Sequence, residues 1–174
     1  MCVDYRDLNQ ASPKDNFLLP HIDTLVDNTA KHSLFSFMDG FSGYNQIKMA
    51  PEDMEKTTFV TMCGTFCYLV MPFGLKNAGA TYQRAMVMFH DMMYKEIEVY
   101  VNDMIAKSKR EREHVGNLRK LFERLRKFQL KLNPAKCTFR ATSGKLIGFI
   151  VSERGIEVDP DKIKAIQELP PPRT

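Results

Sequence analysis

The sequence predicts an α+β fold, in which one antiparallel sheet carries helices packed on one face. Two observations predict it: strand segments are interleaved with helical segments, and consecutive strands are joined by hairpins. The order along the chain is strand, helix, two strands, helix, hairpin, helix, hairpin. The chain has 174 residues, of which 44% are hydrophobic, and this is enough for one domain with a buried core.

The first predicted strand covers residues 34–39 and ends in the carboxylate of Asp39. Gly40 and Gly43 interrupt it, because glycine tolerates backbone conformations that end a strand. A short helical stretch is expected to follow.

The second pair of strands is a predicted hairpin over residues 57–71, with its turn at Cys63-Gly64. After it, residues 78–94 are rich in Ala, Met and aromatic side chains without alternation. This composition predicts a buried helix.

Residues 96–107 predict a second hairpin. Ile97 and Val99 alternate with Glu98 and Tyr100, which is the period of a strand with one buried face. Asn102-Asp103 supplies residues that favour turns, so we expect the turn there.

The next predicted element is a helix that begins with a capping box, Ser108 to Glu111. Its apolar residues recur at helical spacing: Val115, Leu118, Leu121, Phe122, Leu125 and Phe128. Asn133-Pro134 ends it. A last hairpin spans residues 145–158 and turns at Glu153-Arg154-Gly155. Pro170-Pro171-Pro172 favours an extended connector, so we interpret the chain as a fragment of a longer protein.

The net charge of +4 is unevenly distributed. Residues 107–140 contain 12 Lys and Arg against 3 Asp and Glu, whereas the rest of the chain has an acidic excess. This pattern fits either a polyanion bound on one side or a solvated helix face.

The cysteines (Cys2, Cys63, Cys67, Cys137) match no zinc or redox motif and are interpreted as reduced thiols, and the four histidines are assigned no role.

No apolar run approaches the roughly 20 residues that cross a bilayer. The charged start of the chain also excludes a signal peptide of the usual kind, so we interpret the protein as intracellular, not secreted and without a membrane partner.

Two acidic residues, Asp39 and Asp103, lie where predicted strands end or turn. A sheet of this kind can bring two such strand ends side by side. Carboxylates at one sheet edge suit magnesium, which takes oxygen ligands and completes its shell with phosphates and water. From the residues alone, an ordinary pair of turn aspartates is the better explanation, because aspartate is common at strand ends and turns.

Several segments resemble reverse transcriptases of gypsy-type LTR retrotransposons, in the same order along nearly the whole chain. They are Val3 to Asn9, Leu19 to Asp23, Phe37 to Ile47, Met71 to Ala78, Tyr100 to Asp103, Leu132 to Cys137 and Leu146 to Ser152. The segment at 100–103 occupies the place of that family's Tyr-x-Asp-Asp motif.

The resemblance implies a right-hand polymerase palm with partial fingers and the start of the thumb. Residues 1–33 would be partial fingers, and 34–145 the palm, with an interleaved fingers segment at about 45–70. Residues 146–174 would be a primer-grip-like hairpin and thumb connection.

The resemblance also implies Mg²⁺ or Mn²⁺ as cofactor. The implied partners are an RNA or DNA template with primer, deoxynucleoside triphosphates, and the thumb and ribonuclease H of the polyprotein. The implied location is the cytoplasm, in a virus-like particle, or the nucleus.

Residue roles follow from the same resemblance. Asp39, Asp103 and the degenerate position Asn102 match the catalytic carboxylates, and the Gly40 carbonyl is a further metal contact. The residues that match the nucleotide site are Phe41, Ser42, Gly43, Tyr44 and Phe73. Those that match template or primer contacts are Asn77, Gln83, Gly148 and Phe149. The alternatives are core packing for Tyr44 and an ordinary β-turn for Gly148.

The chain departs from the family at Asn102, where the family has aspartate, and at Gly79, where it commonly has proline. An amide brings no negative charge, so we expect severely impaired catalysis; Gly79 predicts only looser template positioning. The alternative function is a non-catalytic nucleic-acid-binding remnant. A small RNA-recognition module is the third hypothesis, but no segment matches its RNP1 pattern.

Overall fold

The computed structural model describes residues 3–169, so Cys2 and the proline run 170–172 lie outside the described residues. The helices are α1 (Arg6–Ala11), α2 (Ile22–Thr29), α3 (Pro51–Met54), α4 (Ala78–Ala85), α5 (Glu111–Lys127) and α6 (Pro160–Gln167). The 3₁₀ turns are η1 (Gly43–Gln46), η2 (Glu55–Thr57), η3 (Met86–Phe89) and η4 (Pro134–Lys136). Among these described segments, no helix combines the length and apolar character needed to span a bilayer.

The strands form three antiparallel sheets. The central sheet has the order β4-β5-β1-β6, from Ile97–Tyr100, Asp103–Ser108, Leu34–Asp39 and Thr138–Ala141. A three-stranded sheet follows, β7 (Ser143–Leu146), β8 (Phe149–Ser152) and β9 (Gly155–Val158). A separate hairpin pairs β2 (Phe59–Thr61) with β3 (Gly64–Phe66).

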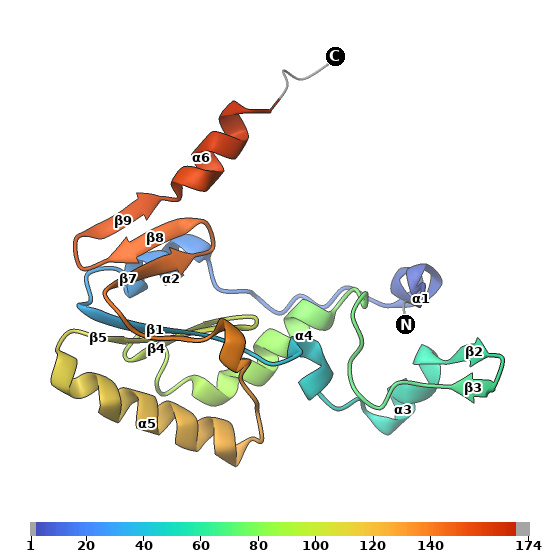
Figure 1. Ribbon diagram of the computed structural model, residues 1–174. Helices are drawn as coiled ribbons and strands as arrows, with labels where there is room; N and C mark the ends of the chain where they lie inside the picture. The colour runs from blue at the N-terminus through green and yellow to red at the C-terminus, as the bar shows by residue number, and fades with distance from the viewer. Residues whose placement is uncertain (1–2, 170–174) are drawn as a thin grey trace.

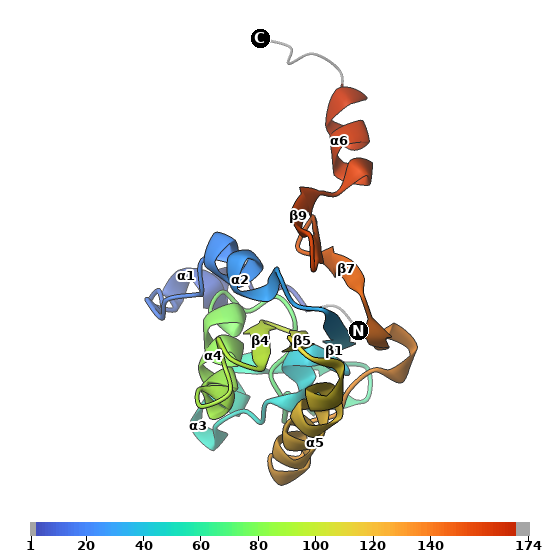
Figure 2. The same ribbon diagram turned by 90° about the vertical axis from the view of Figure 1, so that its left-hand side faces the viewer.

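The central sheet is covered on both faces (Figures 1 and 2). On one face, Met38 and Met104 pack with Tyr82 of α4 and with Leu121 and Leu125 of α5. This confirms the predicted helices on one face. The opposite face is not open, however: Phe35 and Ile105 pack there with residues of α2, β7 and β8.

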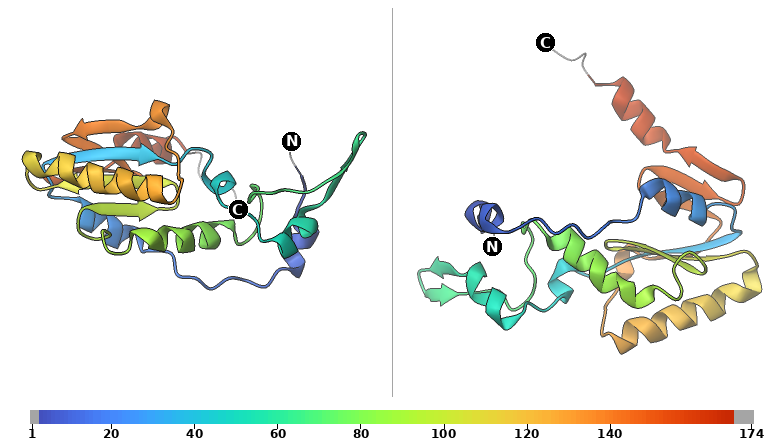
Figure 3. Two further views of the ribbon diagram at one scale, coloured as in Figure 1. Left: turned by 90° about the horizontal axis from the view of Figure 1, so that it is seen from below. Right: turned by 180° about the vertical axis from the view of Figure 1, so that it is seen from behind.

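The β7–β9 sheet approaches β1 closely because Gly144 lacks a side chain. A Cβ at Gly144 would lie 2.2 Å from the ring of Phe37. Away from the sheets, α1, α3 and the β2–β3 hairpin form an arm that projects beyond η1 and α4 (Figure 3). Helix α6 also projects from the sheets, beyond β9 and away from this arm (Figure 1).

Two predicted hairpins differ from the structure in their details. The first is shorter than the predicted 57–71: its strands end at Phe66, and Thr57 belongs to η2. In the second, Tyr100 pairs with Asp103, so the turn residues are Val101 and Asn102, one position earlier than predicted. The composition of Asn-Asp misled the prediction, because Val101 itself takes the left-handed conformation, with φ 51°.

Two predicted helix features are also wrong. The helix over 78–94 stops at Ala85 and continues only as η3. The capping box does not form, because α5 begins at Glu111 after Arg110, without a side-chain cap. Ser108 is instead the last residue of β5, where its hydroxyl bonds to His114.

The predicted last hairpin, 145–158, is confirmed as β8 and β9, with β7 added as a third strand. β7 and β8 are joined by a two-residue turn at Ile147-Gly148, in which both residues have positive φ. Isoleucine rarely takes this conformation, so the sequence did not indicate a turn there and the added strand was missed.

A fully buried ion pair links β4, β5 and α2. The Lys107 ammonium lies 2.7 Å from the Glu98 carboxylate, and both side chains are at most 1% exposed. Lys107 also donates to the backbone carbonyl of Asn28, near the end of α2. Burial raises the pKa of Glu98, against the opposing effect of the Lys107 hydrogen bond. The pair therefore ties a helix to the sheet at a desolvation cost.

His114 forms a second buried polar contact, on the other face of the sheet. Its imidazole nitrogens lie 2.8 Å from the Ser36 hydroxyl and 2.9 Å from the Ser108 hydroxyl. Burial lowers the pKa of His114 below its ordinary value of 6.5. The neutral ring thus docks α5 on β1 and β5, a role that the sequence analysis did not assign.

We expect Lys107→Met to lower the free energy of unfolding by about 3–5 kcal/mol, because it leaves the Glu98 carboxylate buried without its partner. The double variant Glu98→Leu with Lys107→Met should recover a large part of this loss. Urea unfolding followed by circular dichroism measures both. Equal stabilities of the single and double variants would contradict the role of the pair.

We expect stability to fall as the pH drops below about 6.5, since the unfolded chain binds a proton to His114 more readily than the folded chain does. A group with a lowered folded pKa stabilises above its unfolded pKa, and this contribution disappears at lower pH. His114→Gln should therefore show a shallower loss of unfolding free energy between pH 6.5 and 5. Parallel pH profiles for the two chains would exclude this linkage.

Candidate active site

The pairing of β1 with β5 places Asp39 directly opposite Asp103. Directly opposed residues on neighbouring antiparallel strands have Cβ atoms about 4.5–5.5 Å apart and point to the same face. Two carboxylates far apart in sequence therefore meet at one end of the central sheet. They open into a cleft of about 290 Å³, which is lined by Phe37, Met38, Asp39, Asp103, Met104, Ile105, Lys136, Lys145 and Leu146.

The two carboxylates influence each other electrostatically. Partial burial raises the pKa of Asp103 above its ordinary value, and the negative charge of Asp39 raises it further. Lys136 acts in the opposite direction, and its ammonium lies 3.4 Å from a carboxylate oxygen of Asp39. The cleft thus contains two neighbouring carboxylates, and the ammonium of Lys136 is their counter-ion.

Asn102 lies in the turn between the two hairpin strands, beside the aspartates. Its backbone carbonyl accepts a hydrogen bond of 2.9 Å from the Gly40 N–H. Its side chain packs against Gly43, where φ is +39° and a Cβ would come within 2.4 Å of the amide nitrogen. The side-chain oxygen Oδ1 is buried and has no hydrogen-bond donor among the described residues.

These oxygens fit one divalent cation better than two. Asp39 and Asp103 supply two carboxylates, which is the usual protein contribution to a magnesium site. The buried amide oxygen of Asn102 is a neutral donor. Among residues 3–169, no three His, Cys, Asp or Glu side chains gather closely enough to hold a metal ion.

The residues expected at a nucleotide site line the segment after β1. Ser42 has φ 56° and is exposed, as are Phe41 and Phe73. The Tyr44 ring lies between Phe73 and Tyr82, with ring centroids 5.4 and 5.6 Å away. Tyr44 therefore packs on the core through Tyr82 and also contacts the exposed Phe73. Core packing and the predicted place in a nucleotide site are compatible for this residue.

Tyr82 is a core residue that the sequence analysis did not single out. Burial, followed by the nearby Asp39 and Tyr44, raises the pKa of Tyr82 to about 12. A Cβ at Gly40 would lie 3.1 Å from its hydroxyl. Tyr82 thus supports the floor beneath Gly40 and Tyr44 as a neutral phenol.

Two predicted template contacts have other partners in the structure. Gln83 is only 4% exposed, and its amide accepts from the Val101 N–H at 2.9 Å. Its nitrogen donates to the Val99 carbonyl. This burial is inconsistent with a direct template contact and makes Gln83 a support of the hairpin that carries Asp103. The helical pattern of α4 gave no sign of this, because the partner lies 18 residues away.

Asn77 likewise uses its side chain internally. It donates to the Pro13 carbonyl at 2.8 Å and accepts from the Asp15 N–H at 3.1 Å. It therefore fixes the segment after α1 to the start of α4, rather than presenting its amide to a ligand.

Gly148 lies in the turn between β7 and β8, directly before Phe149. Gly148 has φ +87°, and a Cβ there would collide with the Lys162 side chain. Its carbonyl accepts from the Asp159 N–H at 3.2 Å. Leu146, two residues before Gly148, lines the cleft, whereas Gly148 and Phe149 are not among its lining residues.

A family model described as reverse transcriptase (RNA-dependent DNA polymerase) matches residues 1–151. The chain belongs to the reverse transcriptase family. Among curated proteins it is 37% identical over 171 residues to the Retrovirus-related Pol polyprotein from transposon 297 of Drosophila melanogaster, covering 98% of this chain and 16% of that protein. It is 36% identical over 173 residues to the polyprotein from transposon gypsy of the same species, covering 99% and 17%. The predicted resemblance to gypsy-type elements is confirmed.

A more distant relative is the Transposon Tf2-3 polyprotein of Schizosaccharomyces pombe, 30% identical over 174 residues, covering 99% of this chain and 13% of that protein. This reverse transcriptase chain thus spans less than a fifth of the curated relatives it matches.

Solved structures confirm the fold of the reverse transcriptase chain. The foamy viral protease-reverse transcriptase in complex with RNA/DNA hybrid matches with a TM-score of 0.84 at 22% identity, over 98% of this chain and 23% of that chain. A second foamy viral structure, in complex with double-stranded DNA, gives 0.88 at 22% identity, over 98% and 30%.

Two lysines of this reverse transcriptase chain were missed as site residues. Lys136 contacts Asp39, and Lys145 lines the same cleft while pairing with Asp159 at 3.0 Å. Lys136 lies in the basic segment 107–140 and in the matched run 132–137, whereas Lys145 lies outside both and had no such sequence signal.

We expect Asp39→Asn to lower the pKa of Asp103, because it removes the neighbouring like charge. Lys136→Met should move the same pKa upward, because it removes the counter-ion. Carbon-13 NMR titration of the Asp103 carboxyl measures both shifts. Shifts in the same direction, or none for Asp39→Asn, would show that the three groups do not share one cleft.

Proposed function

We propose that this chain is the core of an RNA-directed DNA polymerase, a nucleotidyltransferase that extends a primer along a template. The observation that carries the proposal is the pairing of Asp39 with Asp103 at one end of the central sheet. Family membership and the transposon relatives support it.

Asp39 and Asp103 would hold Mg²⁺ or Mn²⁺, with the Gly40 carbonyl as a further oxygen donor. A divalent cation supplies charge that activates an attacking hydroxyl and stabilises a leaving pyrophosphate. The two carboxylates would fix its place, and Lys136, whose ammonium lies 3.4 Å from Asp39, would have to give up this contact. The Gly40 carbonyl also accepts from the Gly43 N–H at 3.4 Å, a long bond that leaves the oxygen available.

The loop after β1 would receive the nucleotide. Backbone N–H groups around Ser42 and Gly43 would face the triphosphate, since glycine and the left-handed Ser42 allow close backbone approach. The Phe41 N–H is already used, because it donates to the Lys131 carbonyl at 2.9 Å. Tyr44 lies beneath the sugar, where its ring leaves no room for a 2′-hydroxyl. The exposed Phe73 completes the pocket on the ring of Tyr44.

The wider assignment divides the chain into partial fingers (1–33), palm (34–145, with fingers residues at about 45–70) and primer-grip hairpin with thumb connection (146–174). Gly148 and Phe149 would hold the primer end. The proposed partners are an RNA or DNA template with primer, deoxynucleoside triphosphates, and further parts of the polyprotein.

The unpaired thiols of Cys63, Cys67 and Cys137 support an intracellular place of action, in the cytoplasm or nucleus.

Asn102 impairs this activity. The Coulomb interaction between close charges in a partly dry site is about 4 kcal/mol, and the missing carboxylate removes one such interaction with the bound cation. Water and phosphate oxygens offset part of it. A remaining loss of ~3 kcal/mol in transition-state stabilisation slows the reaction roughly a hundredfold.

We expect Asn102→Asp to raise the rate of primer extension at least tenfold, with magnesium on a homopolymer template. The assay needs a chain extended on both sides by the segments that the transposon relatives carry. Asn16→Asp is the matched control, because it adds the same charge at an exposed position away from the cleft. Equal rates for Asn102→Asp and the parent would refute this account of position 102.

A second candidate function is a nucleic-acid-binding remnant without catalysis. The neutral amide at position 102 and the basic segment 107–140 favour it. Salt-dependent duplex binding, together with no extension by either the parent or Asn102→Asp, would select this alternative.

A further inference from the structure

Helix α5 carries an exposed row of arginines that alternate with apolar side chains. The row consists of Arg112, Val115, Arg119, Phe122 and Arg126, at spacings of three and four residues, and we call it the arginine stripe. Such spacing keeps side chains on one side of a helix. All five are exposed, whereas His114, Leu121 and Leu125 face the sheet.

The apolar members of the stripe lie outside the core, although their helical spacing in the sequence groups them with the buried Leu121 and Leu125. Val115 is 67% exposed and Phe122 is 41% exposed. Phe139 of β6, itself 48% exposed, lies beside Phe122 with ring centroids 6.2 Å apart in an edge arrangement. Two accessible aromatic rings thus border the row of arginines.

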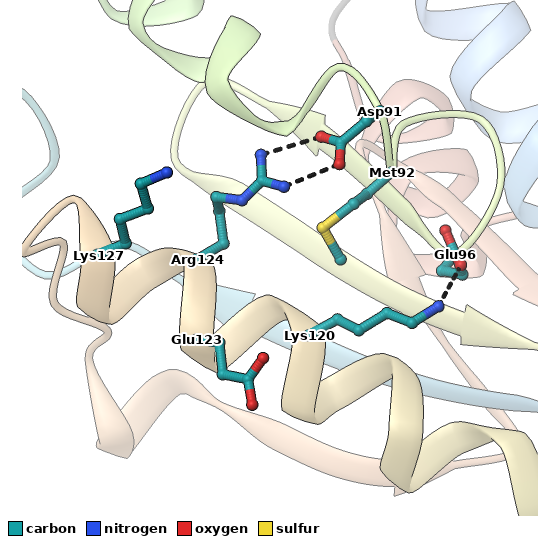
Figure 4. Close-up of a pocket in the computed structure, with 7 residues that line it drawn as sticks. All are labelled: Asp91, Met92, Glu96, Lys120, Glu123, Arg124 and Lys127. Atoms are coloured by element: carbon teal, nitrogen blue, oxygen red, sulfur yellow. Dashed lines mark hydrogen bonds and ion pairs between the residues drawn. The ribbon is translucent and has the colours of Figure 1, made fainter.

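The charges of the stripe are not neutralised within the described chain. Other basic residues of the helix are engaged: Arg124 forms two hydrogen bonds to Asp91, and Lys120 contacts Glu96 (Figure 4). Arg112, Arg119 and Arg126 form no salt bridge within residues 3–169. At 1.5 Å per residue, the three guanidinium groups are distributed along about 21 Å.

The stripe is separated from the candidate active site by the central sheet. Asp39 and Asp103 share the face of Phe35 and Ile105, which packs on α2, β7 and β8. Helix α5 covers the opposite face, as Figure 1 shows for α5 and β7–β9. A ligand bound on the exposed side of α5 would therefore occupy a different surface from the Asp39–Asp103 cleft.

We propose that the arginine stripe, with Phe122 and Phe139, binds single-stranded nucleic acid. Proteins that bind single strands without sequence preference combine a basic track for phosphates with aromatic rings on which bases stack. An acidic protein segment would also match the charge, but it would not use two accessible rings beside the arginines. The inference does not rest on the proposed polymerase activity.

The test is fluorescence anisotropy of a labelled oligouridine RNA of about 20 nucleotides, in EDTA, over a series of salt concentrations. The triple variant Arg112→Gln, Arg119→Gln, Arg126→Gln should bind at least tenfold more weakly at low salt. Its salt dependence, as the slope of log affinity against log salt, should be shallower by about 2, because each single-strand phosphate contact contributes about 0.7.

The control triple variant Lys14→Gln, Arg154→Gln, Lys164→Gln removes the same charge from exposed positions on other elements and should bind almost as the parent does. Asp39→Asn should leave the effect of the stripe unchanged, which separates this inference from the polymerase proposal. Circular dichroism melting verifies that each variant is folded.

The aromatic part is tested by Phe122→Leu, which keeps an apolar side chain but removes the ring. Its affinity for the RNA should fall roughly fivefold, whereas Phe66→Leu on the β2–β3 hairpin should have no effect. Parent-like RNA binding by the arginine variant would overturn the proposal. Loss of poly-glutamate binding by that variant with RNA binding retained would assign the stripe to an acidic protein partner instead.

Discussion

The antiparallel pairing of β1 with β5 is the constraint on which the rest of the structure depends. It runs from Leu34 opposite Ser108 to Asp39 opposite Asp103. Because both faces of the sheet are buried, a slip of one residue would exchange the faces of Phe35 and Met38 and bury Asp39 against the helices. The hydrophobic core therefore sets the register, and the register places two like charges side by side. Like charges directly opposite are unfavourable on their own, and the cation proposed for this site would relieve their repulsion.

Buried polar groups make this register more specific than apolar packing alone would. The Glu98–Lys107 pair ties β5 to β4 and α2, and His114 joins Ser36 of β1 to Ser108 of β5 from the opposite face. Any shift of β5 would leave a charge or a ring nitrogen buried without its partner, at a cost of several kcal/mol for the charge. The strand that carries Asp103 is thus held from both faces.

The sequence revealed the parts of the fold that depend on local pattern. The strand before Asp39 and the hairpin before Asp103 were predictable because alternation and turn residues are short-range signals. Glu98 was read as solvent-facing because its partner, Lys107, is visible only once the strands pair. Periodicity placed Phe122 on a helix, but it does not show which sides of a helix are covered, so the exposure of Phe122 was not predictable. The supporting role of Gln83 was hidden for the same reason, since its partners belong to another element.

Under the proposed function, the amide at position 102 would weaken catalysis without disturbing the fold. Asparagine has the shape of aspartate, so its side chain keeps the contact with Gly43, and its carbonyl keeps the hydrogen bond from Gly40. What changes is charge alone, and charge matters most where cations and phosphates gather. Since α5 lies across the sheet from this position, its arginines do not depend on the missing carboxylate. Loss of charge at the cleft therefore leaves both the fold and the basic surface of α5 intact.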